Sequence, residues 1–393
     1  MTNMSVKSIL ASTALVVVSA VVTIVAVEAA LRIAFPTGYL IWKPHMSRTF
    51  LPSPEVMPGI IGNSRFQTNS KGLRADELND ADRYRILAIG GSTTECLYLD
   101  QSETWPQLLQ DSLNRSPGAP KTWVGNAGMS GRNSRHHVIA LSHLPLDEMK
   151  VDAVVVLAGV NDLSLRLSQD SAFDPKAMAK PSVRSKLMEE TFLGMGYGNP
   201  QDPWLKRSYL WQALRKLKER LAGPAERRQA QDHTGDIYVA WRRHRQDAMD
   251  IRATLPNLSM AIEEYKTNLK ALVAIARERS LRLILATQPS MWKPGLPREL
   301  QSLLWLGGVG DFQVRAGQPY YSVESLSLAM KQYNDAMLSV CESEAVECVD
   351  LSNMTKDTTV FYDDVHFNVA GASQVARIMA AHILARPPFK RRL

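Results

Sequence analysis

The sequence predicts an α/β protein with a doubly wound parallel sheet, because short apolar runs alternate with segments of helical periodicity. The apolar runs are rich in β-branched residues and cover 84–89, 122–125, 151–158, 281–287 and 346–351. None alternates cleanly between polar and apolar residues, which is typical of strands buried on both faces. In such a sheet, ligands bind at the carboxyl ends of the strands.

Helical patterns separate the apolar runs. After the first run, Trp105, Leu109 and Leu113 share one helical face, and a similar stripe extends from Ile262 to Ala276 before the fourth. Two further helices are expected near 325–341 and 369–386. We therefore expect an α/β domain formed by 83–162 and 257–393.

The first 35 residues carry the membrane signal of the 393-residue chain. No residue from Ile9 to Val27 is charged, and this length of 19 residues is close to the ~20 that a helix needs to cross a bilayer. Lys7 precedes the run and Glu28 follows it. We expect 1–35 to be an uncleaved anchor in the inner membrane, with the rest of the chain exported towards the periplasm or the cell exterior. A signal peptide with a weak cleavage site at 26–30 is the alternative.

Residues 36–82 contain five prolines and are expected to form a tether or an irregular wrap over the domain. Within this segment, "TNSKGLR" at 68–74 predicts a turn centred on Gly72.

Residues 163–256 interrupt the alternation of strands and helices. They contain 17 Lys and Arg against 11 Asp and Glu, and so account for nearly all of the chain's net charge of +7. A structureless loop of this length is improbable. The segment is either a partly helical cap beside the active site or a solvated helical insertion. Nucleic acid is not an expected partner, since both signs of charge are interspersed.

Three cysteines are too few for a disulfide scaffold. Cys341 and Cys348 could pair across a helix–strand turn, but the burial habit of free cysteine favours two unpaired thiols. No Cys and His cluster has metal-ligand spacing, and neither a metal nor a cofactor is expected.

Polar groups stand at the ends of three successive predicted strands. Ser92 follows two glycines in "GGSTTE", where a helix start would offer free N–H groups to an oxyanion. Gly128 and Asn161 follow the next two strands, where they can supply a backbone N–H and a side-chain amide. These groups converge in one crevice of a doubly wound sheet, where they could hold an oxyanion while the serine attacks a carbonyl.

A base for that serine is found after the fifth strand. His366 lies in "FYDDVHFNVAG" just before a helix, and Asp363 precedes it by three residues. One tight turn can return this carboxylate to the imidazole and fix its tautomer.

The stretches "IGGSTTE", "GNAGMSG", "AGVND" and "DDVHFNVAG" resemble, in this order, the four blocks of the SGNH (GDSL-type) hydrolase superfamily. The resemblance covers roughly 84–162 and 281–385. It implies a three-layer α/β/α sandwich with a flavodoxin-like, five-stranded parallel sheet. It also implies a catalytic triad and an oxyanion hole, with Ser92 as nucleophile, His366 and Asp363 as base and orienting acid, and the N–H of Ser92, Gly128 and Asn161 as oxyanion donors.

Two departures from the family pattern stand out. Gly91 replaces the usual Asp before the nucleophile, and the insertion at 163–256 is longer than in compact members. The apolar leader followed by a Pro-rich stretch and "NSKGLR" is similar to membrane-tethered bacterial members, several of which act on acyl groups of cell-surface glycans.

These observations predict a serine esterase that cleaves an O-acyl ester, with O-acetyl among the candidates, on a cell-surface glycan or lipid. One alternative is an O-acyltransferase that uses the same groups on an envelope polysaccharide. The other is a non-catalytic glycan-binding or scaffold protein.

Overall fold

The computed structural model describes residues 6–34, 39–192, 205, 208–222 and 234–389. It contains a five-stranded parallel sheet of β3 (Tyr84–Gly90), β4 (Thr122–Gly128), β5 (Ala153–Leu157), β7 (Arg282–Ala286) and β9 (Glu347–Val349). The strand order is β4-β3-β5-β7-β9. The prediction of a doubly wound sheet is confirmed, and the order is that of a flavodoxin-like fold.

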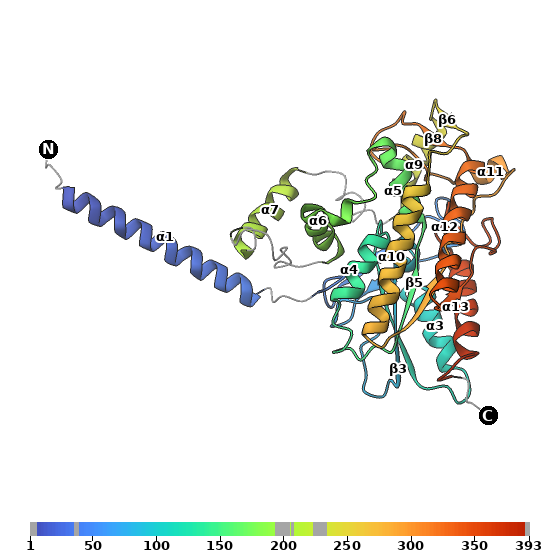
Figure 1. The fold of residues 1–393 in the computed structure, drawn as a ribbon, viewed down its shortest axis with the longest axis horizontal. Helices are drawn as coiled ribbons and strands as arrows, with labels where there is room; N and C mark the ends of the chain where they lie inside the picture. The colour runs from blue at the N-terminus through green and yellow to red at the C-terminus, as the bar shows by residue number, and fades with distance from the viewer. Residues whose placement is uncertain (1–5, 35–38, 193–204, 206–207, 223–233, 390–393) are drawn as a thin grey trace.

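Helices cover both faces of this sheet, which gives the three layers (Figure 1). One face carries α3 (Trp105–Asn114) and α13 (Val369–Leu384), which pack against each other. The other carries α4 (Ser134–His143), α10 (Ser259–Glu278) and α12 (Val323–Ser343). Every residue of β3, β4 and β5 is buried, as the apolar runs require. The remaining short elements of the domain are α2 (Ser92–Glu95), α5 (Val160–Gln169), α11 (Arg298–Gln301), β6 (Ile251–Arg252) and β8 (Tyr320–Tyr321).

The segment after the leader wraps over the domain. It forms an antiparallel pair, β1 (Ser47–Phe50) with β2 (Ser64–Gln67), and its side chains Phe50, Met57 and Phe66 enter the core. The Trp42 indole N–H donates to the Gly128 carbonyl at 3.2 Å. Of the two interpretations of 36–82, the structure therefore favours the wrap.

The insertion is largely helical where it is described, although it ends with the short strand β6. It contains the end of α5, then α6 (Pro181–Thr191), α7 (Tyr209–Ala222) and α9 (Ile237–Gln246). Residues 193–204, 206–207 and 223–233 of the insertion lie outside the described residues. Helix α9 packs into the domain through Tyr238 and Trp241, so this part of the insertion is not a solvated appendage.

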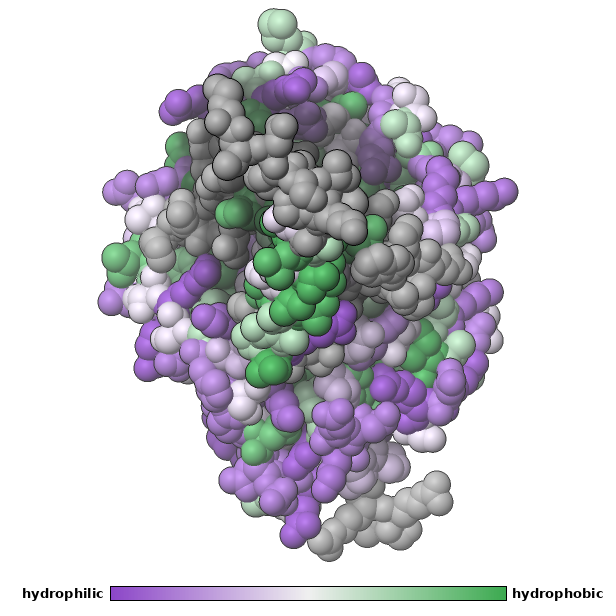
Figure 2. Space-filling view, turned by 90° about the vertical axis from the view of Figure 1, so that its left-hand side faces the viewer, coloured by the Kyte–Doolittle hydropathy of each residue, from purple (hydrophilic) through white to green (hydrophobic). Residues whose placement is uncertain are grey.

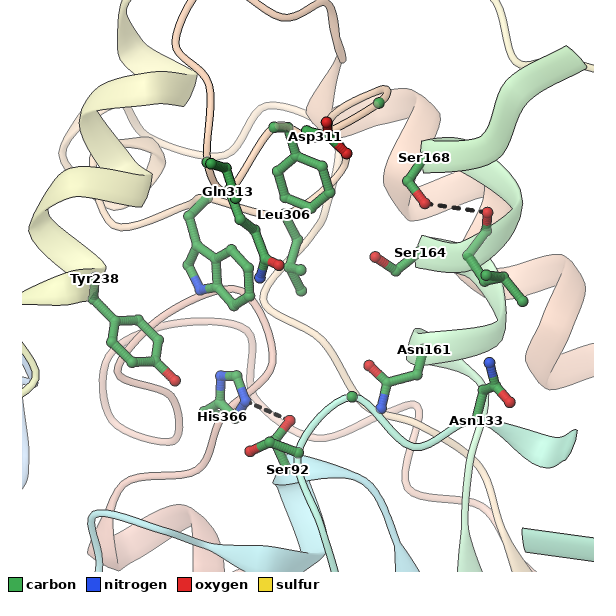
Figure 3. Close-up of a pocket in the computed structure, with 17 residues that line it drawn as sticks. Ser92, Asn133, Asn161, Ser164, Ser168, Tyr238, Leu306, Asp311, Gln313 and His366 are labelled. Carbon is green, nitrogen blue, oxygen red and sulfur yellow. Dashed lines mark hydrogen bonds between the residues drawn. The ribbon is translucent and has the colours of Figure 1, made fainter. Parts of the chain in front are cut away.

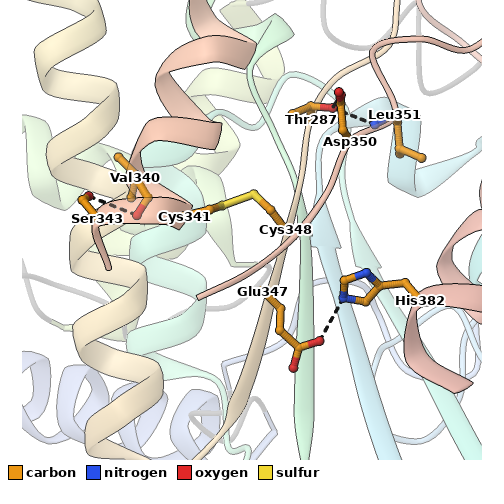
Figure 4. The surroundings of a disulfide bond; sticks show 9 residues. All are labelled: Thr287, Val340, Cys341, Ser343, Glu347, Cys348, Asp350, Leu351 and His382. Atoms are coloured by element: carbon orange, nitrogen blue, oxygen red, sulfur yellow. Dashed lines mark hydrogen bonds and ion pairs between the residues drawn. A yellow bond between two sulfur atoms is a disulfide. The ribbon is translucent and has the colours of Figure 1, made fainter. Parts of the chain in front are cut away.

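The expectation of two free thiols at Cys341 and Cys348 is wrong. The two form a disulfide that joins the last turn of α12 to β9 (Figure 4). Their Cα atoms are 6.0 Å apart, within the range that a disulfide spans. The frequent burial of free cysteine favoured two unpaired thiols, but the short turn between α12 and β9 brings the side chains of Cys341 and Cys348 together.

Helix α1 (Val6–Ala34) projects away from the domain (Figure 1). Its Ser12–Ala34 part is long and apolar enough to cross a membrane, a property that a signal sequence shares. On the face of the molecule that carries α1, hydrophobic residues gather near the centre, and most of the coloured residues towards the edge are hydrophilic (Figure 2).

Candidate active site

Ser92 stands at the carboxyl end of strand β3, as the first residue of α2. Gly91 before it has no room for a side chain, because a Cβ there would lie 2.2 Å from Nδ2 of Asn161. The glycine that replaces the usual Asp therefore lets the Asn161 amide approach the turn. Figure 3 shows Asn161 beside Ser92, each reaching the site from a different strand end.

His366 connects Ser92 to Asp363. Its Nε2 lies 2.7 Å from the Ser92 Oγ, and its Nδ1 lies 2.7 Å from Asp363 Oδ2. The other oxygen, Asp363 Oδ1, accepts the backbone N–H of Val365 at 3.0 Å and that of His366 at 2.8 Å. The expected tight turn thus holds both the carboxylate and the imidazole, and the structure brings the three side chains together.

Burial and charge act in opposite directions on this pair. Burial disfavours the imidazolium, but the charge and hydrogen bond of Asp363 outweigh it, so the pKa of His366 lies above its ordinary value. Burial likewise disfavours the Asp363 carboxylate, yet the attraction of His366 and the backbone N–H groups keep its pKa below the ordinary value. Asp363 therefore stays ionised at neutral pH and fixes Nδ1 of His366 as the donor.

The expected oxyanion donor at Gly128 is wrong. Its N–H already donates to Asn126 Oδ1 at 2.8 Å, and the residue is buried at the end of β4. Gly131, three residues on, lines the cavity in front of Ser92 instead. It has a φ of +75°, and a Cβ there would meet only open space, so this glycine is explained by backbone conformation. Two glycines, Gly128 and Gly131, follow the predicted strand 122–125 in "GNAGMSG", and spacing alone did not distinguish them.

Three candidate N–H donors belong to residues that line the same cavity, namely Ser92, Gly131 and Asn161. Asn161 Nδ2 donates one hydrogen to the Arg132 carbonyl at 2.8 Å and has a second available. Within the described chain, no acceptor binds the backbone N–H of Ser92 or of Gly131. These are the types of donor that an oxyanion hole needs.

A cavity of about 370 Å³ opens above Ser92 and His366 (Figure 3). One wall is polar and comes from the β4–α4 loop and α5. The opposite wall comes from α9 and the segment after β7, and it combines aromatic rings with aliphatic side chains and the polar Asp311 and Gln313. The polar wall consists of Ser130, Asn133, Asn161, Ser164 and Ser168, and the rings of the opposite wall are those of Tyr238, Trp305 and Phe312.

The chain matches the sequence profile of the GDSL-like lipase/acylhydrolase family over residues 88–373, which is more than half of its length. It belongs to this family. It is accordingly an ester hydrolase, as the order of its four motifs predicted.

Solved structures also resemble this hydrolase. Acetylxylan esterase Axe2 from Geobacillus stearothermophilus is 14% identical, with a TM-score of 0.39, and the alignment covers 79% of this chain and 96% of Axe2. LAE5, an α/β hydrolase from the metagenome of Lake Arreo, Spain, is 16% identical, with a TM-score of 0.37, and the alignment covers 79% of this chain and 97% of LAE5. No curated protein matched.

Trp305 is a site residue of this GDSL-like hydrolase that the sequence did not reveal. Its indole N–H donates to Asp363 Oδ2 at 2.9 Å, and its ring lies within 4° of the imidazole plane of His366. Asp364 holds Trp305 in place by accepting its backbone N–H at 2.7 Å. Burial raises the pKa of Asp364 to about 6. Trp305 lies between β7 and α12, in a segment that contains no recognisable motif. The signal available in the sequence was the pair Asp363 and Asp364, both of which accept hydrogen bonds from Trp305.

Arg74, the last residue of "TNSKGLR", braces the turn that carries the nucleophile. The buried guanidinium donates to the carbonyls of Glu95, Cys96 and Leu99, each at 2.6 Å. Burial lowers its pKa to about 10, so it remains charged at neutral pH. The Glu95 carboxylate in turn accepts the hydroxyl of Ser130, next to Gly131. The wrap thus supports both the nucleophile and the loop of the candidate oxyanion donor.

Proposed function

We propose that this hydrolase is a membrane-anchored serine esterase that removes an O-acyl group, such as acetyl, from a cell-surface glycan or lipid. The observation that carries the proposal is the chain of two 2.7 Å contacts from Ser92 through His366 to Asp363. A serine hydroxyl becomes an effective nucleophile when a positioned base removes its proton.

The reaction takes two steps. His366 Nε2 accepts the Ser92 proton while Oγ bonds to the ester carbonyl carbon, and the N–H groups of Ser92, Gly131 and Asn161 hold the oxyanion. His366 then gives the proton to the departing alcohol, and an acyl-serine remains. Water loses a proton to His366 and attacks the acyl carbon, which releases the acid and restores the Ser92 hydroxyl. Asp363 stays ionised and orients the imidazole throughout.

The two walls of the cavity favour a sugar as the alcohol part of the ester. Hydroxyl and amide side chains on one side can bond to the hydroxyls of a sugar, and the rings of Tyr238, Trp305 and Phe312 can pack against its C–H faces. The same polar wall could hold a sugar as acyl acceptor, which would give an O-acyltransferase. Incubation of the full chain with an acetyl ester, with and without an oligosaccharide, separates the two activities, because an esterase releases acetate and a transferase acetylates the glycan.

Two hydrogen bonds support the retention of the leader as an anchor, and the disulfide supports export of the domain. The backbone N–H groups of Tyr209 and Leu210 both donate to the Glu28 carboxylate at 2.9 Å. Cleavage at the weak site would remove this carboxylate together with the leader. The disulfide between Cys341 and Cys348 fits an oxidising compartment, such as the periplasm or the cell exterior.

Labelling the detergent-solubilised full chain with a fluorophosphonate, followed by peptide mapping, tests the nucleophile. We expect one adduct, on Ser92, and none in Ser92→Ala. Ser168→Ala, which changes a serine of the same cavity far from His366, should still label at Ser92. An adduct on a different residue, or no adduct together with no ester hydrolysis, contradicts the mechanism. A Ser92→Ala chain that retains full function in cells would favour the scaffold alternative.

A further inference from the structure

Helix α7 exposes several of its apolar side chains and buries polar ones, which is the reverse of what a helix on a soluble domain does. Tyr209 and Gln212 are 3% and 6% exposed, whereas Leu214 and Leu217 are 55% and 53% exposed and Trp211 is 49% exposed. A helix on a soluble domain buries its apolar stripe and exposes its polar side. The leucine face of α7 therefore needs a cover that the described part of the chain does not provide.

The start of α7 is fixed to the domain-side end of α1. Glu28 accepts the N–H groups of Tyr209 and Leu210, and the Arg32 guanidinium lies 5.0 Å from the centre of the Tyr209 ring. Glu28 is the first charged residue after the uncharged run of α1. The first turn of α7 thus lies at the level where the uncharged run of α1 ends.

The direction of α7 suits a membrane surface. In Figure 1 it runs across the direction of α1 instead of alongside it. If α1 spans the bilayer, a helix that begins beside Glu28 and leads away from α1 in a transverse direction lies along the bilayer surface. The sequence of α7 also has four basic residues and one acidic residue, a balance that suits anionic headgroups.

We propose that α7 is an interfacial helix, whose face of Trp211, Leu214 and Leu217 lies at the headgroup–acyl boundary of an anionic phospholipid bilayer. Tryptophan and leucine on one face of a basic helix are typical of such helices. This inference rests on the anchor of the proposed function. Together α1 and α7 attach the protein at two points, so the enzyme meets the membrane in one orientation and not as a freely swivelling domain.

Spin labels on the full chain in phosphatidylglycerol-containing liposomes test this inference. Cys96 is buried and the other two cysteines are paired, so an introduced cysteine is the accessible thiol of the described chain. Labels at Leu214→Cys and Leu217→Cys should be more accessible to oxygen than to a water-soluble nickel complex. The matched control is Leu328→Cys on α12, because Leu328 is an equally exposed leucine at 54% and should show the opposite preference.

A label at Val16→Cys in α1 makes the outcomes distinguishable. If the label at Val16 is exposed to lipid but the labels at Leu214 and Leu217 are more accessible to the nickel complex than to oxygen, like the label at Leu328, the role of α7 is overturned and the anchor remains. Water exposure at Val16 overturns the anchor and this inference with it. Spin–spin broadening at Leu214 that disappears on dilution with unlabelled chain would identify a second copy as the cover, and would also overturn the inference.

Discussion

Replacing Gly91 with alanine is the sharpest test of the oxyanion geometry. The added methyl carbon would lie 2.2 Å from Asn161 Nδ2 and 3.1 Å from the Arg132 carbonyl oxygen. Ordinary contacts of a Cβ begin at 3.4 Å, so the amide must move by more than 1 Å. Gly91 has a φ of −87°, which alanine adopts without strain, so the perturbation acts on Asn161 and not on the backbone. Loss of one oxyanion donor lowers kcat by about 10²–10³, or ~2.7–4 kcal/mol.

The assay is hydrolysis of nitrophenyl acetate by the wild type, Gly91→Ala, Asn161→Ala and the double variant. We expect both single variants to lose kcat by a similar factor with little change in KM. The double variant should lose no more than either single variant, because both changes remove the same donor. Thermal unfolding of each variant controls for loss of the folded state.

Two results would refute this reasoning. A Gly91→Ala enzyme with wild-type kcat would show that the amide position does not matter. Additive losses in the double variant would show that the methyl group acts through something other than Asn161.

Three further predictions concern the base, its support and the disulfide. His366 must be neutral to accept a proton, and its pKa is raised above the ordinary value. We therefore expect kcat/KM to increase with pH, with the midpoint of the increase above about 6.5. A midpoint below that value in the pH profile would contradict this prediction. Trp305→Phe keeps a ring beside His366 but removes the N–H that donates to Asp363. Because a hydrogen bond to a charged group contributes ~1.5 kcal/mol, we expect kcat/KM to fall by roughly tenfold. Unchanged kinetics would show that Trp305 does not support Asp363 in catalysis. Cys348→Ser opens the bond to Cys341 and should lower the free energy of unfolding by about 2 kcal/mol, as reductant should in the wild type; denaturant curves that coincide with those of the oxidised wild type would contradict this.

Residues close together in the chain were the reliable guide to the fold and to part of the site. The apolar runs located all five strands of the sheet within a few residues, because burial on both faces leaves a local composition. The placement of Asp363 three residues before His366 predicted their contact, since one turn closes that distance. The prediction of Gly128 as an oxyanion donor was wrong because two glycines follow the predicted strand 122–125. The hydrogen bond from the Gly128 N–H to Asn126, which the sequence did not reveal, removes Gly128 from the site.

The sequence by itself determined the class of sheet, the motifs at its strand ends and the apolar leader, because each depends on composition or spacing over a few residues. Only the tertiary structure decided which glycine faces Ser92, that Trp305 supports Asp363, and that Arg74 braces the turn of the nucleophile. It also decided that α7 turns its leucines outward beside Glu28. These contacts join residues between 21 and 182 positions apart in the chain, and no local pattern records which of many distant polar groups will meet.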